Sequence, residues 1–330
     1  MTRAIVRQFG SPAEVVMTES TDDHQALSAG QVRVRMLLAS INPSDLVTIS
    51  GAYRSRTTLP FVPGFEGVGI VESIGEDVST LRVGQRVLPI GSVGAWQDVK
   101  VAEQRWCFPV PEDLSNEQAA TAYINPLTAW LMVEQFAPTR PGEMVVVNAA
   151  TSAIGQMIIR MLNRKGLRPI AIIRRADAAM ELDGLDIEAV LDSSEGDIQS
   201  RVQEVSGGRG LTVACDAVGG PEGDSLARAL SPGGTLVHYG LLSGVPLSYR
   251  LYSERPDVRI ILFHLREWVH AASPVEIQSA FDEVFGLIRD GTAASRVAHV
   301  FPLTDIRRAL ATEARPKRQG KVFVTTRYAG

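Results

Sequence analysis

The feature that most constrains the fold is a strand, a turn of small residues, a helix and a second strand between residues 143 and 173. Residues 143–148 (EMVVVN) and 169–173 (PIAII) are the two strands, and the helix is expected from about 154 to 164. Uninterrupted apolar strands of this kind are typical of a parallel sheet covered on both faces. This βαβ unit predicts an α/β protein with a doubly wound, Rossmann-type parallel sheet.

The remaining segments differ in character on the two sides of this unit. Alternating or short apolar runs at 31–37, 68–75, 83–89 and 96–101 predict a barrel-like β domain. Later strands at 211–216 and 234–239 continue the doubly wound sheet, and 274–289 has the apolar spacing of an amphipathic helix. We therefore expect three segments: a β domain at 1–120, a doubly wound domain at 121–264, and a C-terminal part at 265–330.

Composition excludes several classes of protein. The net charge is −4, so the chain lacks the basic excess usual in a general nucleic-acid binder, and nothing predicts attraction to a membrane surface. The only cysteines are Cys107 and Cys215, which excludes a disulfide framework and a structural zinc site with several thiolates. The sequence has no apolar run long enough for a membrane span and no signal peptide, so a cytoplasmic location is expected.

The turn at 148–155 is a candidate pyrophosphate site, because a helix N-terminus offers unpaired N–H groups to an anion. Of the three glycines in the dinucleotide fingerprint, only Gly155 is present, so an ordinary strand-to-helix turn remains an alternative. Arg174 and Arg175 follow the second strand, where NAD-binding proteins usually carry an acid for the ribose hydroxyl. Two guanidiniums there favour the 2′-phosphate of NADP, the alternative being two solvated arginines.

Several motifs together resemble the medium-chain dehydrogenase/reductase superfamily. They are 40–45 (SINPSD), 51–53 (GAY), 63–67 (PGFEG) and 81–87 (LRVGQRV). The resemblance implies a GroES-like β-barrel domain interrupted by the Rossmann domain, with the C-terminal segment returning to the first part. Zinc members of the superfamily have His where this chain has Phe65, and Cys where it has Pro43 or Ser44. The resemblance thus implies a branch without zinc, in which Glu66 is structural and no metal site is expected.

Other motifs are similar to the 2-enoyl thioester reductases of the mitochondrial fatty-acid synthesis type. They are 94–97 (GAWQ), 124–129 (INPLTA), 217–220 (AVGG), 239–240 (YG) and 263–268 (FHLREW). This resemblance implies NADPH-dependent reduction of a conjugated C=C bond, with hydride added to the β-carbon and a proton donated by Tyr53 to the α-carbon. Tyr53 as a loop aromatic that only packs or orients substrate is the alternative. An NADPH:quinone or general enone reductase, and a cofactor-binding protein without catalysis, are the alternative functions.

The same resemblance carries a set of site residues. The implied cofactor contacts are Asn125, Thr128, Thr151, Ser152, Ala153, Ile154, Arg174, Arg175, Tyr239, Gly240, Leu241, Leu242, Phe263, His264, Leu265, Arg266 and Lys321. The candidate substrate contacts are Asn42, Arg54 and Arg56.

Local alternatives stay open for some of these residues. Asn125 is also compatible with a simple Asn-Pro turn, Thr128 with a cap for the helix that follows, and the two loop arginines with a solvated loop. Residues 263–266 are expected to be strand-like, and His264 stands where the family usually has Trp, which leaves the acyl chain open. A small acyl thioester or enone substrate and a homodimer are the partners that the resemblance implies.

Overall fold

The structure is a computed structural model, and it describes residues 1–22, 26–138, 140, 142–315 and 320–328. Backbone contacts divide the chain into two units. The first contains Met1–Ile124 and Arg266–Gly330, and the second contains Asn125–Leu265.

The second unit is built on a six-stranded sheet in which all neighbours are parallel, in the order β10-β9-β8-β11-β12-β13. The strands are β8 (Met144–Val147), β9 (Ile170–Ile173), β10 (Ala189–Asp192), β11 (Leu211–Asp216), β12 (Thr235–His238) and β13 (Arg259–Leu262). Every residue of β8 and β9 is buried, as their apolar sequences predict. The strand order reverses between β8 and β11, the position where such sheets bind ligands at their carboxyl ends.

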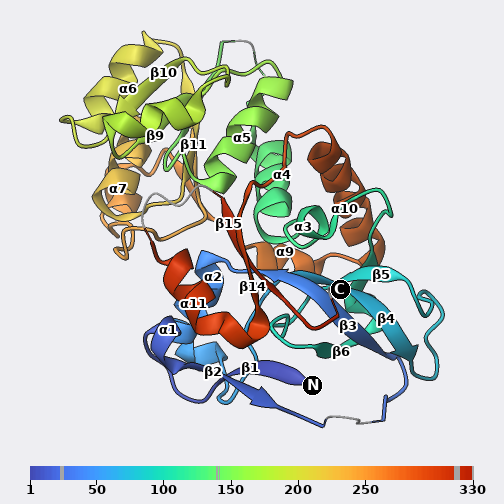
Figure 1. Cartoon of the computed structure of the whole chain (residues 1–330). Coiled ribbons are helices and arrows are strands. Elements are labelled where there is room, and N and C mark those ends of the chain that lie inside the picture. The colour runs from blue at the N-terminus through green and yellow to red at the C-terminus, as the bar shows by residue number, and fades with distance from the viewer. Residues whose placement is uncertain (23–25, 139, 141, 316–319, 329–330) are drawn as a thin grey trace. The chain divides into compact units, whose positions relative to one another are not determined.

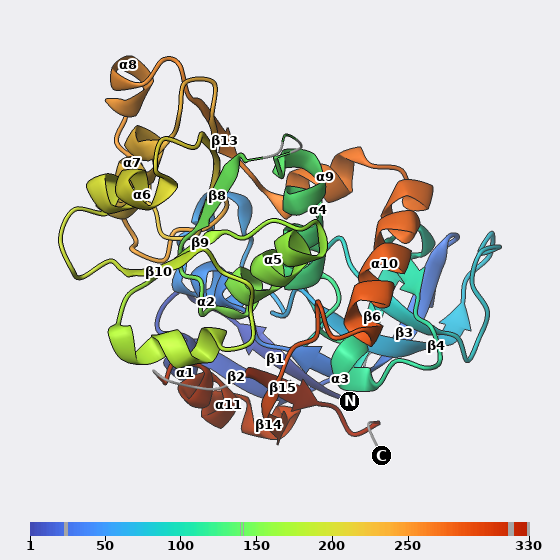
Figure 2. The ribbon, with the colours of Figure 1, turned by 90° about the horizontal axis from the view of Figure 1, so that it is seen from above.

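Helices cover this sheet. They are α4 (Ile124–Phe136), α5 (Ala153–Arg164), α6 (Ile198–Ser206), α7 (Gly220–Ala229) and α8 (Leu251–Glu254), with a 3₁₀ segment η3 (Ala176–Leu182). Helix α5 packs against β8 (Figure 2), and α6 lies beside α7 (Figure 1). The inward face of α5 is apolar and buried, so hydrophobic burial holds the helix that follows the candidate pyrophosphate turn.

The first unit has a seven-stranded sheet and a two-stranded hairpin. The hairpin is β1 (Thr2–Val6) with β2 (Val16–Ser20), and the sheet has the order β14-β15-β3-β4-β5-β7, with β6 also paired to β3. These strands are β3 (Gln31–Ser40), β4 (Gly67–Ile74), β5 (Arg86–Pro89), β6 (Val99–Glu103), β7 (Cys107–Pro109), β14 (Val297–Pro302) and β15 (Lys321–Thr325). Strand β15 pairs with β3, so the C-terminal segment becomes part of the N-terminal sheet.

Short helices complete this unit. They are α1 (Pro12–Val15), α2 (Pro43–Ser50), α3 (Asn116–Ala119), α9 (Leu265–Ala271), α10 (Pro274–Arg289) and α11 (Ile306–Glu313), with 3₁₀ segments η1 (Arg54–Arg56), η2 (Gln104–Trp106) and η4 (Leu303–Asp305). Figure 1 shows α11 against β14 and β15, with α1 beside it. In the part of the chain that the structure describes, no helix is long and apolar enough to cross a membrane.

One local expectation is wrong, and one local alternative is excluded. Residues 263–266 are not strand-like, because β13 ends at Leu262 and the helix α9 begins at Leu265. The ladder stops there because the last residue of β12, His238, pairs with Leu262. Thr128 does not cap a following helix, since it lies inside α4. That helix already includes Asn125 and Pro126, and proline is tolerated in a first turn, where its missing N–H has no helical acceptor.

Candidate functional site

The turn between β8 and α5 has the local geometry of an anion-binding site. Ser152 caps α5, and its Oγ accepts a hydrogen bond of 3.0 Å from the N–H of Gly155. The N–H groups of Ala153 and Ile154 belong to the same first turn, where an α-helix has no internal acceptor for them. The N-terminus of α5 therefore offers donors and a positive dipole end to an anion.

Gly155 allows the helix to approach this turn closely. A Cβ at this position would lie 2.6 Å from the carbonyl oxygen of Ala149 and 2.9 Å from that of Ala150. These oxygens belong to the backbone and cannot move aside easily, so only glycine fits without a shift. The third glycine of the dinucleotide fingerprint has the same use, which is close packing of helix and strand.

Arg174 and Arg175 follow β9, the strand next to β8 in the sheet. Arg174 is exposed, and its charge acts on the half-buried Glu222, whose pKa is raised mainly by burial and lowered in part by Arg174. Arg175 Nε lies 3.7 Å from Asp177 Oδ1, an exposed ion pair of small energetic weight. Two cationic groups thus lie one strand away from the candidate pyrophosphate turn.

The loop after β12 contains Tyr239, Gly240, Leu241 and Leu242. A Cβ on Gly240 would lie 2.7 Å from the carbonyl oxygen of Ala217, so this loop packs tightly on the one that follows β11. The hydroxyl oxygen of Tyr239 is buried and has no hydrogen-bond partner among the described residues, while Leu241 and Leu242 are exposed. The loop therefore combines an unpaired buried hydroxyl with exposed apolar side chains.

The remaining predicted residues of this unit lie beyond β13 and on α4. Phe263 is buried and meets Phe136 edge-on, with ring centroids 6.5 Å apart. His264 is exposed, while Thr128 and Asn125 lie in the first two turns of α4, with Thr128 buried.

In the first unit, Asn42 lies in a buried polar cluster around Glu66. One carboxylate oxygen of Glu66 accepts hydrogen bonds from Ser40 Oγ at 2.5 Å and Asn42 Nδ2 at 2.8 Å. The other oxygen accepts one from the backbone N–H of Ile124 at 2.7 Å. Lys321, also buried, donates from Nζ to Asn42 Oδ1. Glu66 thus connects Ser40, Asn42 and the backbone of Ile124, and Asn42 in turn holds Lys321 of β15. These bonds give the carboxylate a structural role.

Asp45 fixes the two segments on either side of this cluster. Its carboxylate accepts hydrogen bonds from the N–H of Asn42 at 2.8 Å and from that of Phe65 at 3.0 Å. Burial raises the pKa of Asp45 to about 7, although these bonds and Lys321 oppose the shift. Asp45 therefore titrates near neutral pH while it holds the backbone next to Glu66.

Tyr53 lies on the loop between α2 and β4. Gly51, which has a φ of 89°, caps the C-terminus of α2, and Tyr53 precedes the 3₁₀ turn that contains both candidate arginines. The guanidinium carbon of Arg56 is 3.9 Å from the centroid of the Tyr53 ring, and Arg54 Nε donates to the Gly51 carbonyl oxygen at 3.2 Å. Tyr53 is half-buried, while both arginines are exposed.

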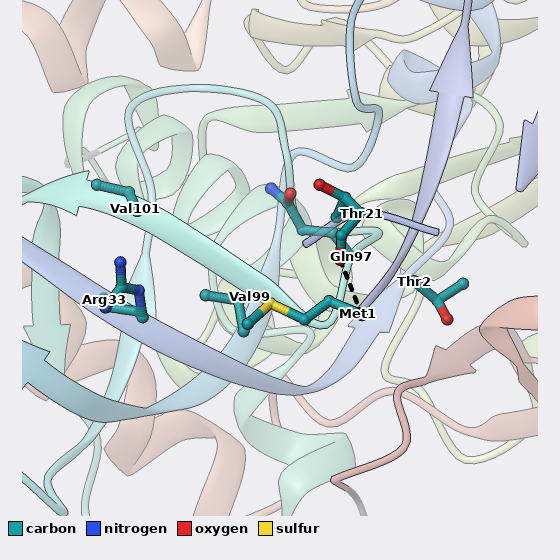
Figure 3. A pocket seen from close by; sticks show the side chains of 7 residues that line it. All are labelled: Met1, Thr2, Thr21, Arg33, Gln97, Val99 and Val101. Atoms are coloured by element: carbon teal, nitrogen blue, oxygen red, sulfur yellow. Dashed lines mark hydrogen bonds between the residues drawn. The ribbon is translucent and has the colours of Figure 1, made fainter. Parts of the chain in front are cut away.

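A small hollow of about 110 Å³ lies elsewhere in the first unit (Figure 3). Its lining includes Met1, Thr21, Arg33 and Gln97, and none of the predicted site residues. The terminal ammonium of Met1 already donates to the Thr21 carbonyl oxygen at 2.9 Å, as the dashed line in Figure 3 marks. The described residues also contain no group of three or more His, Cys, Asp or Glu side chains suited to a metal ion.

Comparison with known proteins places the chain in a family. The alcohol dehydrogenase GroES-like domain matches residues 28–112, and the domain described as zinc-binding dehydrogenase matches residues 153–283. The mitochondrial enoyl-[acyl-carrier-protein] reductase of Rattus norvegicus is 33% identical over 95% of this chain and 86% of its own length. The human enzyme of the same name is 32% identical over 98% of this chain and 88% of its own.

The chain belongs to the medium-chain dehydrogenase/reductase superfamily, in its enoyl reductase group.

Solved structures agree with this assignment. A Bacillus thuringiensis protein provisionally described as an NADPH:quinone reductase has a TM-score of 0.92 and 35% identity, covering 98% of each chain. The mycobacterial protein Rv1454c, solved in complex with NADPH, has a TM-score of 0.86 and 25% identity, covering 98% of this chain and all of the other. The expected fold, a GroES-like domain with a Rossmann domain, is confirmed.

Sequence analysis gave no role to three polar side chains at neighbouring strand ends, although the first of them begins the candidate pyrophosphate turn at 148–155. Asn148 follows β8, Asp216 ends β11 and His238 ends β12, and their side chains are hydrogen-bonded to one another. The general rule that ligands bind at the carboxyl ends of such strands was the available signal. The sequence held no signal for the hydrogen bonds among these side chains, because the bonds depend on the pairing of strands that are far apart in the chain.

Proposed function

We propose that this protein is an NADPH-dependent reductase of the conjugated C=C bond of 2-enoyl thioesters carried by coenzyme A or an acyl carrier protein. The observation that carries the proposal is the identity of about one third with mitochondrial enoyl-[acyl-carrier-protein] reductases over almost the whole chain. The protein is an oxidoreductase of the medium-chain type, and the residues below give the proposal its chemistry.

The second unit has features that fit NADP(H). The first turn of α5 presents N–H groups to a pyrophosphate, and Ser152 and Gly155 hold that turn in shape. Arg174, exposed at the end of the next strand, is suited to the 2′-phosphate. The buried hydroxyl of Tyr239, unpaired among the described residues, offers one polar group to a bound molecule. We assign the remaining cofactor contacts as the family resemblance implies.

NADPH, when bound, supplies the hydride that adds to the β-carbon of the enoyl group. Thr151 to Ile154 hold the pyrophosphate, and the two arginines after β9 hold the 2′-phosphate. Asn125 and Thr128 would contact the nicotinamide side, and the family resemblance counts residues 263–266 and Lys321 among the cofactor contacts. These residues bind and orient the cofactor, so that its reaction with a bound substrate becomes effectively unimolecular.

Tyr53 donates the proton that the α-carbon needs. A phenol keeps its proton at neutral pH and can therefore act as a general acid. The guanidinium carbon of Arg56, 3.9 Å from the ring centroid, lies over the ring and holds it in place. Arg54 and Arg56 are also exposed on the same turn, so they suit phosphates of coenzyme A or a carrier prosthetic group.

The proposed chemistry uses no zinc. Phe65 stands at a position where zinc members have a histidine ligand, and a phenyl ring cannot bind a metal ion. The carboxylate of Glu66 is already occupied by three hydrogen bonds. The carbonyl of an enoyl thioester accepts the charge that hydride addition creates, so the reaction does not need a Lewis acid.

A second candidate is reduction of quinones or simple enones with NADPH. It is favoured by the 35% identity and TM-score of 0.92 with the Bacillus thuringiensis structure. Quinone reduction needs no acid at an α-carbon, so it would make Tyr53 dispensable.

The deciding experiment follows NADPH oxidation with enoyl-coenzyme A esters of increasing chain length, with quinones and with simple enones. We expect the highest kcat/KM with an enoyl thioester. Higher values with quinones would support the second candidate, and no turnover with any acceptor despite NADPH binding would contradict both candidates. The same series done with NADH as the reductant tests the cofactor preference.

The proposal includes a homodimer and a cytoplasmic location, with no nucleic-acid or membrane partner. Strand β13 is an edge of its sheet and exposes Leu262 to 55%, a surface suited to pairing with the same strand of a second copy. Light scattering coupled to size exclusion measures the mass in solution, and cell fractionation measures the location. A monomer, or a protein found in the membrane fraction, would contradict these parts.

A further inference from the structure

Three side chains form a continuous hydrogen-bonded row across the carboxyl ends of adjacent strands in the second unit. Asn148 Nδ2 donates to Asp216 Oδ1 at 2.6 Å, and His238 Nδ1 lies 2.6 Å from Asp216 Oδ2. The three residues follow or end β8, β11 and β12, which are neighbours in the sheet. The row therefore crosses the point where the strand order reverses, at the edge where such sheets bind their ligands.

Asp216 organises the loop that follows β11. Its side chain is completely buried, and it accepts backbone N–H bonds from Val218 at 2.9 Å and from Gly219 at 3.0 Å. A Cβ on Gly223 would lie 2.6 Å from Asp216 Oδ2, so the first turn of α7 packs directly on the carboxylate. Burial alone would raise the pKa of Asp216, but the bonds from His238, Gly219, Asn148 and Val218 bring it below its usual value. The carboxylate is therefore held in its charged form.

The row links three loops to one another. Asn148 Oδ1 accepts a bond of 2.7 Å from the N–H of Ala217, which ties the turn after β8 to the loop after β11. The carbonyl oxygens of Ala217 and Val218 accept bonds of 3.0 Å from the N–H groups of Leu242 and Ser243. The loop after β12 is thereby tied to the same backbone. All three loops contain or adjoin residues that we assign to cofactor binding.

His238 is the member of the row whose loss would leave Asp216 under-coordinated. Because Asp216 is charged, its oxygens can only accept hydrogen bonds. Nδ1 of His238 therefore carries a hydrogen and donates the bond, whether the ring is neutral or protonated. The His238 side chain is 13% exposed, so solvent screens its interaction with Asp216 only slightly. Among the described residues, removing the donor would leave the buried Asp216 Oδ2 with the long 3.2 Å contact from the Gly219 N–H alone.

We propose that His238, acting through Asp216 and Asn148, is a positioning residue for the dinucleotide. It keeps the three strand-end loops in the geometry that binds the cofactor, and it does not touch the reacting atoms. This inference rests on the proposed function in taking NADPH as the dinucleotide. It goes beyond that function because it makes the affinity for the cofactor depend on Asn148, Asp216 and His238, which do not take part in the reaction.

The test compares His238→Leu with His238→Asn. Leucine fills a similar volume but has no donor, whereas the Asn amide nitrogen lies near the position of Nδ1 and can donate to Asp216. We expect Leu to weaken NADPH binding about tenfold and Asn to restore it to within about twofold of the wild type. NADPH fluorescence titration measures the Kd without any substrate. At saturating NADPH, kcat should stay within about twofold of the wild type in both variants.

The matched control is His299→Leu, the same substitution at an exposed histidine on β14 in the first unit, which should leave the Kd unchanged. A wild-type Kd in His238→Leu together with a lower Tm would overturn the proposal, because the row would then serve folding alone. A lower kcat with an unchanged Kd would overturn it as well. If His238→Leu does not fold, Asp216→Asn is expected to weaken NADPH binding at least as much, and a wild-type Kd there is equally decisive.

The proposed function can fail separately. A wild-type protein that binds NADPH but reduces no enoyl thioester leaves the Kd comparison intact. A wild-type protein that binds no dinucleotide removes both the proposed function and this inference.

Discussion

The guanidinium of Arg56 lies over the aromatic ring of Tyr53, with 3.9 Å between the guanidinium carbon and the ring centroid. Both residues belong to one short turn, so the contact depends on local chain geometry rather than on distant packing. An arginine in this position anchors the ring and offers positive charge to it. The pair therefore links the candidate acid to a candidate substrate contact.

Tyr53→Phe should abolish proton donation and keep the ring in place. We expect kcat with crotonyl-coenzyme A to fall about 100-fold or more, the usual contribution of a positioned general acid. Reduction of a quinone by the same variant should continue at the wild-type rate, which serves as the internal control. An unchanged rate with the thioester would show that Tyr53 is not the donor.

Arg174→Ala should change the choice of cofactor. Loss of a charge-assisted contact to the 2′-phosphate is expected to raise KM for NADPH about ten- to hundredfold and to leave KM for NADH nearly unaltered. Arg228→Ala removes another arginine of the same unit, whose exposed ion pair with Glu254 lies on α7 and α8, and should change neither value. Equal effects of Arg174→Ala on both cofactors would refute the assignment to the 2′-phosphate.

Gly155→Ala should destabilise the protein and weaken NADPH binding together. The added Cβ would meet the Ala149 carbonyl oxygen at 2.6 Å, and strain of this kind costs about 1–3 kcal/mol of unfolding free energy. Gly286→Ala in α10 is the matched control, because its Cβ would meet nothing within 4 Å. That change should stabilise the protein by up to about 1 kcal/mol, since alanine is the better helix former. Thermal or denaturant unfolding of the two variants measures the contrast.

Asp45 should make stability fall as pH rises toward neutrality. Its pKa is about 7 in the folded protein, because burial disfavours the charged form, whereas an Asp in the unfolded chain has a pKa of about 3.9. Between about pH 4 and pH 7 the folded state therefore binds more protons, and the contribution of Asp45 declines as pH rises, by at most about 4 kcal/mol.

The measurement for Asp45 is the difference in Tm between the wild type and Asp45→Asn across this range of pH. The advantage of the wild type over the variant should shrink from pH 5 to pH 7.5 and then level off. Parallel Tm curves would contradict the raised pKa.

Much of the fold could be predicted because its signals are local. The apolar runs of β8 and β9, the helix α5 between them and the amphipathic spacing of α10 all depend on residues close together in the chain. No single motif predicts the GroES-like domain. That prediction came from the family resemblance, which combines several weak motifs. The error at residues 263–266 arose at an element boundary, where the end of a strand ladder decides the outcome.

The sequence by itself determined the doubly wound sheet, the turn with Ser152 and Gly155, and the two arginines after β9, because short-range periodicity and capping chemistry specify them. Only the tertiary structure decided which polar groups meet. Asn148 and Asp216 are 68 positions apart, and Asn42 and Lys321 are 279 apart. Their contacts exist because strand pairing buries these groups side by side, and a buried polar group must find a partner or remain a cost to folding.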